Sequence, residues 1–232
     1  MIRTGGTDLN PATATALSAH FGVPVIQGYG MVETAALTHS DKRARPKPGS
    51  VGPAVRGTEC RIVDMDTGSP LPVGRQGVVQ VRGPQVTIGY LGRDEPPVDQ
   101  GGWLSTGDVG SLDADGYLSL VDRLGDLFKV GNELVSPTEI ERILLAHPDV
   151  RECAVVGGPD EFLGSVPYAL VVPATPDGGD RLADLAEYVN RQVAPHQRLR
   201  HIATIDTIPG ASFGKIHRRE LRDNLTKEKT AP

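Results

Sequence analysis

The hydrophobic pattern of the chain changes at Asp122, and this change constrains the fold more than any other feature of the sequence. Between residues 50 and 121, apolar and polar residues alternate in short runs separated by turns rich in Gly, Pro and Asp. This pattern is typical of a small antiparallel β region, which we expect to be barrel-like. From Asp122 onward, helical segments alternate with short apolar strands. We therefore predict two domains, residues 1–121 and 122–232, of mixed α/β and α+β class.

Residues 1–49 predict the remnant of a β/α layer. Asn10 is a suitable N-cap, Pro11 favours the first helical position, and Gly22 ends the helix. Residues 23–26 then form a short apolar strand that leads into a Gly-rich loop. No strand is predicted before the helix. If residues 1–50 present an unpaired apolar strand and helix face, a separate N-terminal half or a second copy of the chain would cover them; if they pack within the chain, an independent binding module is the alternative.

The second domain predicts a compact α+β unit. The sequence Ser-Pro-Thr-Glu at residues 136–139 is a capping box with proline at the first helical position, and it opens a helix to about His147. The remaining predicted elements are strands at residues 150–158 and 165–174, a helix at 180–193 and a strand at 201–206.

Composition excludes several classes of protein. The net charge of −5 gives no reason to expect binding to nucleic acid or to an anionic membrane. Cys60 and Cys153 lie far apart without other soft ligands, which favours two reduced thiols over a disulfide or a metal site. No apolar run approaches the roughly 20 residues that span a bilayer, and the N-terminus has no apolar signal segment. A cytoplasmic location is the expectation.

The first two of four unusual loops carry glycines and carboxylates. In residues 27–34, Gly28 and Gly30 allow close approach of a ligand, Tyr29 offers a stacking face, and Glu33 suits Mg²⁺. An ordinary Gly-rich turn with a core tyrosine explains this loop equally well. In the second loop, Asp108 follows Thr-Gly and suits the two hydroxyls of a ribose, although an aspartate that closes its own turn is the simpler explanation.

The third and fourth loops are basic. Arg123 suits a ribose or a phosphate, and Lys129 begins a hairpin with Gly131 and Asn132 at its turn. The alternative is a linker with solvated charges. Lys215 follows a glycine just before a basic helix and suits a developing phosphate charge. A nucleic-acid patch and a solvated helix start are the other readings, and the acidic chain favours the second of these.

Taken in order, these loops resemble the core motifs of the adenylate-forming superfamily of acyl-CoA synthetases, peptide-synthetase adenylation domains and beetle luciferases. The segments GGTDL, QGYGMVET, GSVGPAV and GRQGVVQVRGPQVTIGY are similar to the earlier motifs. The segments WLSTGD, DRLGD, KVGNELVSPTEIE and GKIHR match the later ones, and the series covers nearly the whole chain. The form of KVGNELVSPTEIE is closest to that of acyl- and aryl-CoA ligases. The resemblance implies adenylation of a carboxylic acid by ATP with Mg²⁺, followed by thioester formation with CoA.

The resemblance also implies roles for single residues. Tyr29 would stack on adenine, with Gly28 and Gly30 beside the nucleotide, and Glu33 would help to hold Mg²⁺. The ribose hydroxyls would bind Asp108 and Arg123. Lys215 would stabilise charge during adenylation, and Lys129 with the Gly131–Asn132 hairpin would replace it for thioester formation after the C-terminal domain rotates.

Three residues depart from the family pattern. Val32 stands where the family has a phosphate-binding threonine, so we assign Thr34 as the substitute contact. Gly125 stands at the hinge, where it permits every backbone rotation but favours no end state. Asn132 replaces the second glycine of the hairpin, a change that a left-handed turn tolerates.

The sequence contains no Gly-rich phosphate loop of the kind that the family carries upstream of QGYGMVET. We therefore expect the 232 residues alone not to form acyl-AMP. Two alternatives stay open: a non-catalytic split or truncated subunit that complements an N-terminal half, and an adenylation domain that loads a carrier protein. The carboxylic acid substrate is not specified by these residues.

Overall fold

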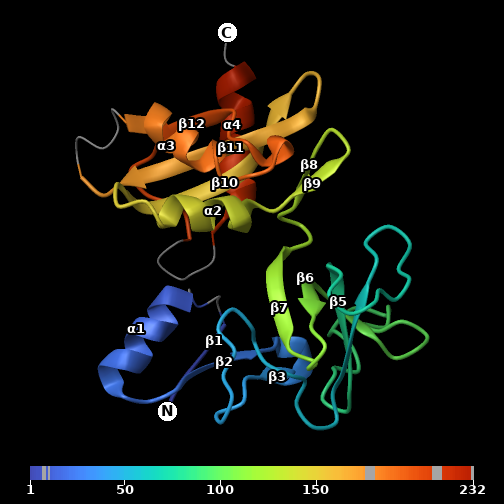
Figure 1. Cartoon of the computed structure of the whole chain (residues 1–232). Helices are drawn as coiled ribbons and strands as arrows, with labels where there is room; N and C mark the ends of the chain where they lie inside the picture. The colour runs from blue at the N-terminus through green and yellow to red at the C-terminus, as the bar shows by residue number, and fades with distance from the viewer. Residues whose placement is uncertain (7–8, 10, 176–180, 211–215, 231–232) are drawn as a thin grey trace. The chain divides into compact units, whose positions relative to one another are not determined.

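The computed structural model describes residues 1–6, 9, 11–175, 181–210 and 216–230, with side chains described as far as Leu225. The chain divides into two compact units, Met1–Leu124 and Gly125–Pro232 (Figure 1). The first unit thus ends three residues after the boundary that the sequence pattern predicts. Within the part of the chain that the structure describes, no helix combines the length and apolar character needed to cross a bilayer.

The first unit begins with a small three-stranded sheet. Strand β1 (Ile2–Gly5) pairs in parallel with β2 (Val25–Tyr29), and β2 pairs antiparallel with β3 (His39–Ser40). Helix α1 (Pro11–Phe21) is the crossover that a parallel pair requires. The expectation that no strand precedes this helix was wrong, because β1 is short and mixes apolar with polar residues. Gly22 ends α1 with φ of +62°, whereas Asn10 lies outside the described residues.

The second sheet of this unit is an antiparallel meander with the order β4–β5–β6–β7. Its strands are β4 (Glu59–Val63), β5 (Gly77–Arg82), β6 (Leu104–Leu112) and β7 (Leu118–Arg123). The expected barrel-like closure is not present among the described residues, where the sheet is open. Its buried core consists of Val51, Ile62, Val79, Val81, Leu104 and Leu118. The predicted mixed α/β class is confirmed, and the barrel-like detail is corrected to an open sheet.

Among its described residues, the second unit combines a hairpin, a three-stranded sheet and three α-helices. The hairpin is β8 (Phe128–Val130) and β9 (Glu133–Val135). The sheet has the order β10 (Val150–Asp160), β11 (Gly164–Pro173), β12 (His201–Thr204). The helices are α2 (Pro137–Leu145), α3 (Leu182–Asn190) and α4 (Arg218–Thr230). Helix α2 begins as predicted, with Ser136 Oγ accepting a hydrogen bond from the backbone N–H of Glu139 at 3.4 Å.

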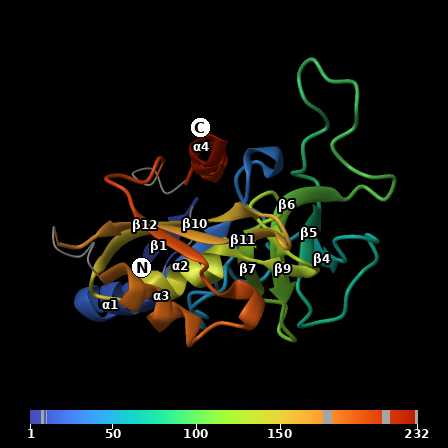
Figure 2. The same ribbon diagram turned by 90° about the horizontal axis from the view of Figure 1, so that it is seen from above.

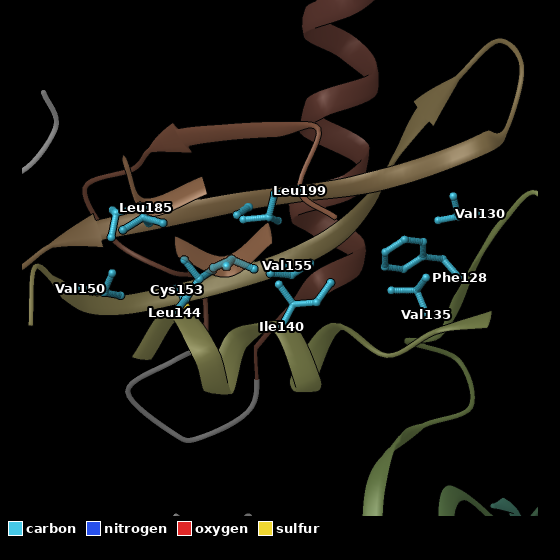
Figure 3. Close-up of a cluster of buried hydrophobic side chains, with 13 residues drawn as sticks. Phe128, Val130, Val135, Ile140, Leu144, Val150, Cys153, Val155, Leu185 and Leu199 are labelled. Atoms are coloured by element: carbon cyan, nitrogen blue, oxygen red, sulfur yellow. The ribbon is translucent and has the colours of Figure 1, made fainter. Parts of the chain in front are cut away.

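The sheet of the second unit is covered on both faces. Alternate residues of β10 enter different cores: Val155 packs with Ile140 and Leu144 of α2, while Val156 packs with Leu221 of α4. Figure 2 shows α4 on one side of this sheet and α2 and α3 on the other. The first core extends to the hairpin, where Phe128, Val130 and Val135 point inward (Figure 3). The hairpin is therefore anchored to this unit by its own apolar face.

Candidate functional site

Three side chains that the motifs assign to a nucleoside come together in the first unit. Tyr29 ends β2, Asp108 lies in β6 and Arg123 ends β7. The Tyr29 hydroxyl donates a hydrogen bond of 2.5 Å to Asp108 Oδ2, and Arg123 Nε lies 3.6 Å from Asp108 Oδ1. Asp108 and Arg123 are cross-strand partners, so the register of the ladder places the guanidinium beside the carboxylate. We call Tyr29, Asp108 and Arg123 the carboxylate cluster.

Burial and charge act in opposite directions on this cluster. Burial raises the pKa of Asp108, while the hydrogen bond from Tyr29 and the charge of Arg123 lower it. Burial, followed by the negative charge of Asp108, raises the pKa of Tyr29 and keeps its hydroxyl a donor. The Arg123 side chain is 70% exposed, in contrast to 16% for Asp108. An ionised carboxylate has about four acceptor positions, so Asp108 retains capacity for further donors.

An irregularity in β6 aims the Asp108 side chain. The β5–β6 ladder shifts its register over this stretch, and Gly107 has φ of +75°, in the left-handed region. Thr106 Oγ1 spans the irregular stretch, because it donates to Val79 O at 2.9 Å and accepts from the Asp108 N–H at 3.1 Å. The sequence places Asp108 in a loop, whereas in the structure it lies within β6. The bulge was not predicted, and the signal that could have indicated it is Gly107, a glycine inside a strand pattern.

The glycines of the first loop have an internal packing role. A Cβ on Gly30 would lie 2.2 Å from Ala36 O, and one on Gly28 would lie 3.2 Å from Leu37 Cδ1. The chain therefore folds back onto this loop so closely that only glycine fits at position 30. Ala36 itself has φ of +81°, a conformation that costs a residue with a Cβ about 1–2 kcal/mol. The interpretation that these glycines admit a ligand is not needed to explain them.

The 3₁₀ turn η1 (Val32–Thr34) contains Glu33, the predicted metal ligand, and sets the directions of the side chains on either side of it. Thr34 is fully buried, and its hydroxyl donates to Met31 O at 3.0 Å and accepts from the Met31 N–H at 3.2 Å. The assignment of Thr34 as a phosphate contact requires its hydroxyl to face a ligand. In the structure the hydroxyl bonds to Met31 instead, so it does not face a ligand. Val32 is 93% exposed and occupies the outward position of the turn. The turn therefore exposes position 32, whose side chain has no hydroxyl, and buries position 34, whose side chain has one.

Glu33 is held by a residue that sequence reasoning missed. Tyr90 donates a hydrogen bond to Glu33 Oε1 at 3.3 Å, and the Thr87 N–H donates to Glu33 O at 2.7 Å. Among the described residues no group of three His, Cys, Asp or Glu side chains is placed to hold a metal ion. A single carboxylate still fits Mg²⁺, which proteins often bind through one or two carboxylates together with substrate phosphates.

In the second unit, the predicted hairpin carries Lys129 on an exposed position of β8. Gly131 adopts φ of +61°, and its N–H donates to Leu163 O in the β10–β11 turn at 2.9 Å. Asn132 is not in the left-handed region, so Gly131 supplies the special conformation of this turn and Asn132 does not. Lys215, the predicted adenylation lysine, lies outside the described residues.

Comparisons with known proteins identify the family to which the chain belongs. Residues 1–91 match the family described as AMP-binding enzyme, and residues 139–215 match the AMP-binding enzyme C-terminal domain. The 4-coumarate–CoA ligase 1 of Glycine max is 37% identical over 234 residues, which cover 97% of this chain and 80% of that protein. The chain belongs to the adenylate-forming, AMP-binding enzyme family that includes the acyl- and aryl-CoA ligases.

Solved structures agree with this assignment. ATP-bound MatB from Rhodopseudomonas palustris matches with a TM-score of 0.87 and 32% identity, covering 96% of this chain and 44% of that chain. The anthranilate CoA ligase AuaEII, in complex with anthranoyl-AMP, matches with a TM-score of 0.86 and 31% identity, covering 99% of this chain and 45% of that chain. The chain thus spans less than half the length of these solved relatives, and the resemblance drawn from the motifs is confirmed for the family.

Proposed function

We propose that the chain contributes the adenine- and ribose-binding surface and the lid of an AMP-forming acyl- or aryl-CoA ligase. The reaction joins a carboxylate to the α-phosphate of ATP with release of pyrophosphate, and CoA then displaces AMP to give the thioester. The observation that carries this proposal is the carboxylate cluster. Its three members come from β2, β6 and β7 and contact one another, and the family motifs assign all three to the nucleoside.

The geometry of the cluster suits a ribose. Asp108 is acceptor-only when ionised, and two vicinal hydroxyls are donors that match its two oxygens. The hydrogen bond from Tyr29 fixes the ring of this tyrosine relative to the carboxylate, which prepares a face for stacking on adenine. The exposed Arg123 remains free to turn toward a ribose hydroxyl or a phosphate. Asp108 therefore orients the sugar, Tyr29 the base, and Arg123 closes the site.

Glu33 is proposed as the protein ligand of Mg²⁺, with Tyr90 holding its side chain. When bound, the ion would supply charge neutralisation on the ATP phosphates. Val32 leaves this corner of the site without the hydroxyl that the family places there. We propose that binding of the phosphates is correspondingly weaker than binding of the nucleoside.

Two lysines are proposed to serve the two half-reactions. Lys215 would stabilise the charge that develops during adenylation, and Lys129 would face the site during thioester formation. The supporting observation is that the second unit begins at Gly125, where an added Cβ would meet nothing within 4 Å. This position has the conformational freedom that a pivot needs. CoA as the thiol is supported by the CoA ligases among the relatives.

Titration of the purified chain with AMP tests the proposal. We expect Asp108→Ala to weaken AMP binding by about tenfold or more, because a hydrogen bond to a charged group is worth about 1.5–3 kcal/mol. Asp66→Ala removes an exposed carboxylate of the same unit and serves as the matched control. Equal AMP affinity in wild type and Asp108→Ala would overturn the assignment. Supplying the N-terminal portion of a relative then tests catalysis, with ATP–pyrophosphate exchange and CoA thioester formation as readouts.

A further inference from the structure

Two buried polar residues of the first unit lie against Tyr29, the residue proposed to stack on adenine. Tyr29 and His39 are partners in the β2–β3 ladder, so their side chains emerge on the same face of this small sheet. Their ring centroids lie 5.9 Å apart at an interplanar angle of 43°. Thr38 and His39 are only 1% and 0% exposed. The ring of Tyr29 therefore has a fully buried neighbour in addition to Asp108.

Thr38 binds the main-chain carbonyl of Tyr29 twice. Tyr29 O accepts the Thr38 N–H at 2.8 Å and the Thr38 hydroxyl at 3.1 Å. Thr38 Oγ1 lies 3.0 Å from His39 Nδ1. On the other side of β3, the Val55 N–H donates to Thr38 O at 2.9 Å. The segment that holds Tyr29 is thus itself bonded to a second stretch of the same unit.

The hydrogen bonds assign the protons of this network. His39 Nε2 has no hydrogen-bond partner among the described residues, and a buried N–H without an acceptor costs free energy. The single proton of the neutral ring therefore belongs on Nδ1, which donates to Thr38 Oγ1. Burial lowers the pKa of His39 to about 4, so the ring is neutral near pH 7. With this tautomer, the Thr38 hydroxyl keeps its own proton for Tyr29 O.

Backbone pairing alone does not require this network. The Thr38 N–H already satisfies Tyr29 O, so the hydroxyl supplies an additional bond. A buried imidazole with one partner also loses hydration, a cost that an apolar side chain of similar size avoids. What the network adds is direction. It fixes the peptide group that follows Tyr29, while the His39 ring restricts rotation of the Tyr29 ring and Asp108 holds its hydroxyl at 2.5 Å.

We propose that Thr38 and His39 are positioning residues that hold Tyr29 for binding of the adenine ring. This inference rests on the proposed function, in which Tyr29 stacks on adenine. Thr38 and His39 touch no nucleotide in this scheme, because both side chains are buried. Asp108 and Arg123 serve the ribose. Loss of the network should therefore weaken the part of the affinity that the base contributes.

Paired titrations of the purified chain with AMP and ribose 5-phosphate test the proposal, because the second ligand lacks the base. Thr38→Val keeps the shape of the side chain and removes its hydroxyl. We expect this variant to weaken AMP binding by about fivefold or more and to leave binding of ribose 5-phosphate within about twofold. Equal weakening of both ligands, or unchanged AMP binding, would overturn the positioning role.

Conservative variants separate a lost hydrogen bond from a general loosening of the unit. Thr38→Ser restores the hydroxyl and should recover most of the wild-type AMP affinity. Thr15→Val removes an exposed hydroxyl that donates to Pro11 O in α1, and this matched control should bind both ligands as wild type does. His39→Asn keeps a donor near the place of Nδ1, whereas His39→Leu has none. AMP binding by the leucine variant as tight as that by the asparagine variant would refute the role of the His39 donor.

A spectroscopic signature of Tyr29 distinguishes failure of this inference from failure of the proposed function. In a chain labelled with tyrosine carrying ¹³C at Cζ, the Tyr29 resonance is identified by its loss in Tyr29→Phe and reports the surroundings of the hydroxyl. We expect Thr38→Val to shift this resonance and Thr15→Val to leave it at its wild-type position. An unchanged resonance in Thr38→Val would overturn the inference. Absence of AMP binding by the wild-type chain would count against the proposed function, and the Tyr29 resonance would still decide whether Thr38 holds this ring.

Discussion

Two of the arginine–carboxylate pairs, one from each unit of the chain, differ in distance, burial and further partners. In the first unit, Arg123 Nε stands 3.6 Å from Asp108, and the guanidinium is largely exposed. In the second unit, Arg218 Nη2 stands 2.6 Å from Glu141, and both side chains are buried. The first carboxylate also accepts from a tyrosine hydroxyl, while the second accepts from the backbone N–H of Val155 in strand β10.

The difference shows what each pair is able to do. An exposed ion pair with a long N–O distance contributes little to stability, and either member can exchange its partner for a ligand. A buried, short pair is locked, because removing either member strands a charge away from water. The carboxylate cluster has the properties of a binding site. The pair of Glu141 with Arg218 has the properties of a fixed structural contact between two helices.

Removing one member of each pair gives the largest difference in stability between the two units. Glu141→Ala should lower the free energy of unfolding of the second unit by about 3–5 kcal/mol, since Arg218 is left buried and unpaired. Arg123→Ala in the first unit should cost at most about 1 kcal/mol, because the side chain is exposed and screened. Urea unfolding followed by probes in each unit measures both values. Comparable losses in the two variants would contradict the distinction.

Acid should act on the first unit through His39. This side chain is fully buried, its ring centroid is 5.9 Å from that of Tyr29, and burial lowers the pKa of His39 to about 4. The unfolded chain binds the proton near pH 6.5, so stability from the neutral imidazole is present above that pH. It is lost progressively as pH falls toward 4, by about 3 kcal/mol in total. His39→Gln should flatten this loss in pH-dependent unfolding, and an unchanged pH profile would refute the assignment.

The bulge beside Asp108 should be moderately sensitive. Gly107→Ala forces a Cβ into the left-handed region at φ of +75° and should cost about 1–2 kcal/mol in unfolding free energy. This cost comes from backbone strain and not from a steric clash, because an added Cβ at Gly107 would meet nothing within 4 Å. Gly116→Ala, at a left-handed glycine in the β6–β7 turn, provides a matched control for strain remote from the carboxylate. AMP affinity should fall in the first variant and not in the second.

The smallest effect on stability belongs to Val32→Thr. Position 32 is exposed, so the change should alter the free energy of unfolding by less than about 0.5 kcal/mol. The introduced threonine hydroxyl would point outward from η1, unlike that of Thr34, and should strengthen binding of ATP relative to AMP. Paired titrations with both nucleotides measure the ratio. Thr34→Val should lower stability instead, because it leaves the Met31 N–H without its side-chain partner.

Much of the fold follows from local sequence signals. The capping box at Ser136, the hairpin at Gly131 and the alternating strands of residues 50–121 all predict the observed elements. The strand at Ile2–Gly5 was missed because its stabilisation is nonlocal: it pairs with residues 25–28 across a helix. The expected barrel closure failed for the same reason, since closure depends on pairing between distant strands and not on the pattern within each.

The candidate site was predictable in its members and not in its contacts. The motifs indicated Tyr29, Asp108 and Arg123, but only the structure shows that a hydroxyl and a guanidinium share one carboxylate. Thr34 looked equivalent to Val32 in the sequence, and the direction of a 3₁₀ turn decides between them. The contacts of Tyr90 with Glu33 and of Glu141 with Arg218 were not predicted, because the partners lie 57 and 77 residues apart in the sequence.

The contrast between the two arginines is tested most directly by AMP titration calorimetry of two matched variants. Arg123→Met alters the exposed pair, and the double variant Glu141→Gln with Arg218→Met removes the buried one without stranding a charge. We predict that Arg123→Met weakens AMP binding by about tenfold while the double variant binds AMP as wild type does. Unchanged affinity in Arg123→Met, or an equal loss in the double variant, would contradict the account.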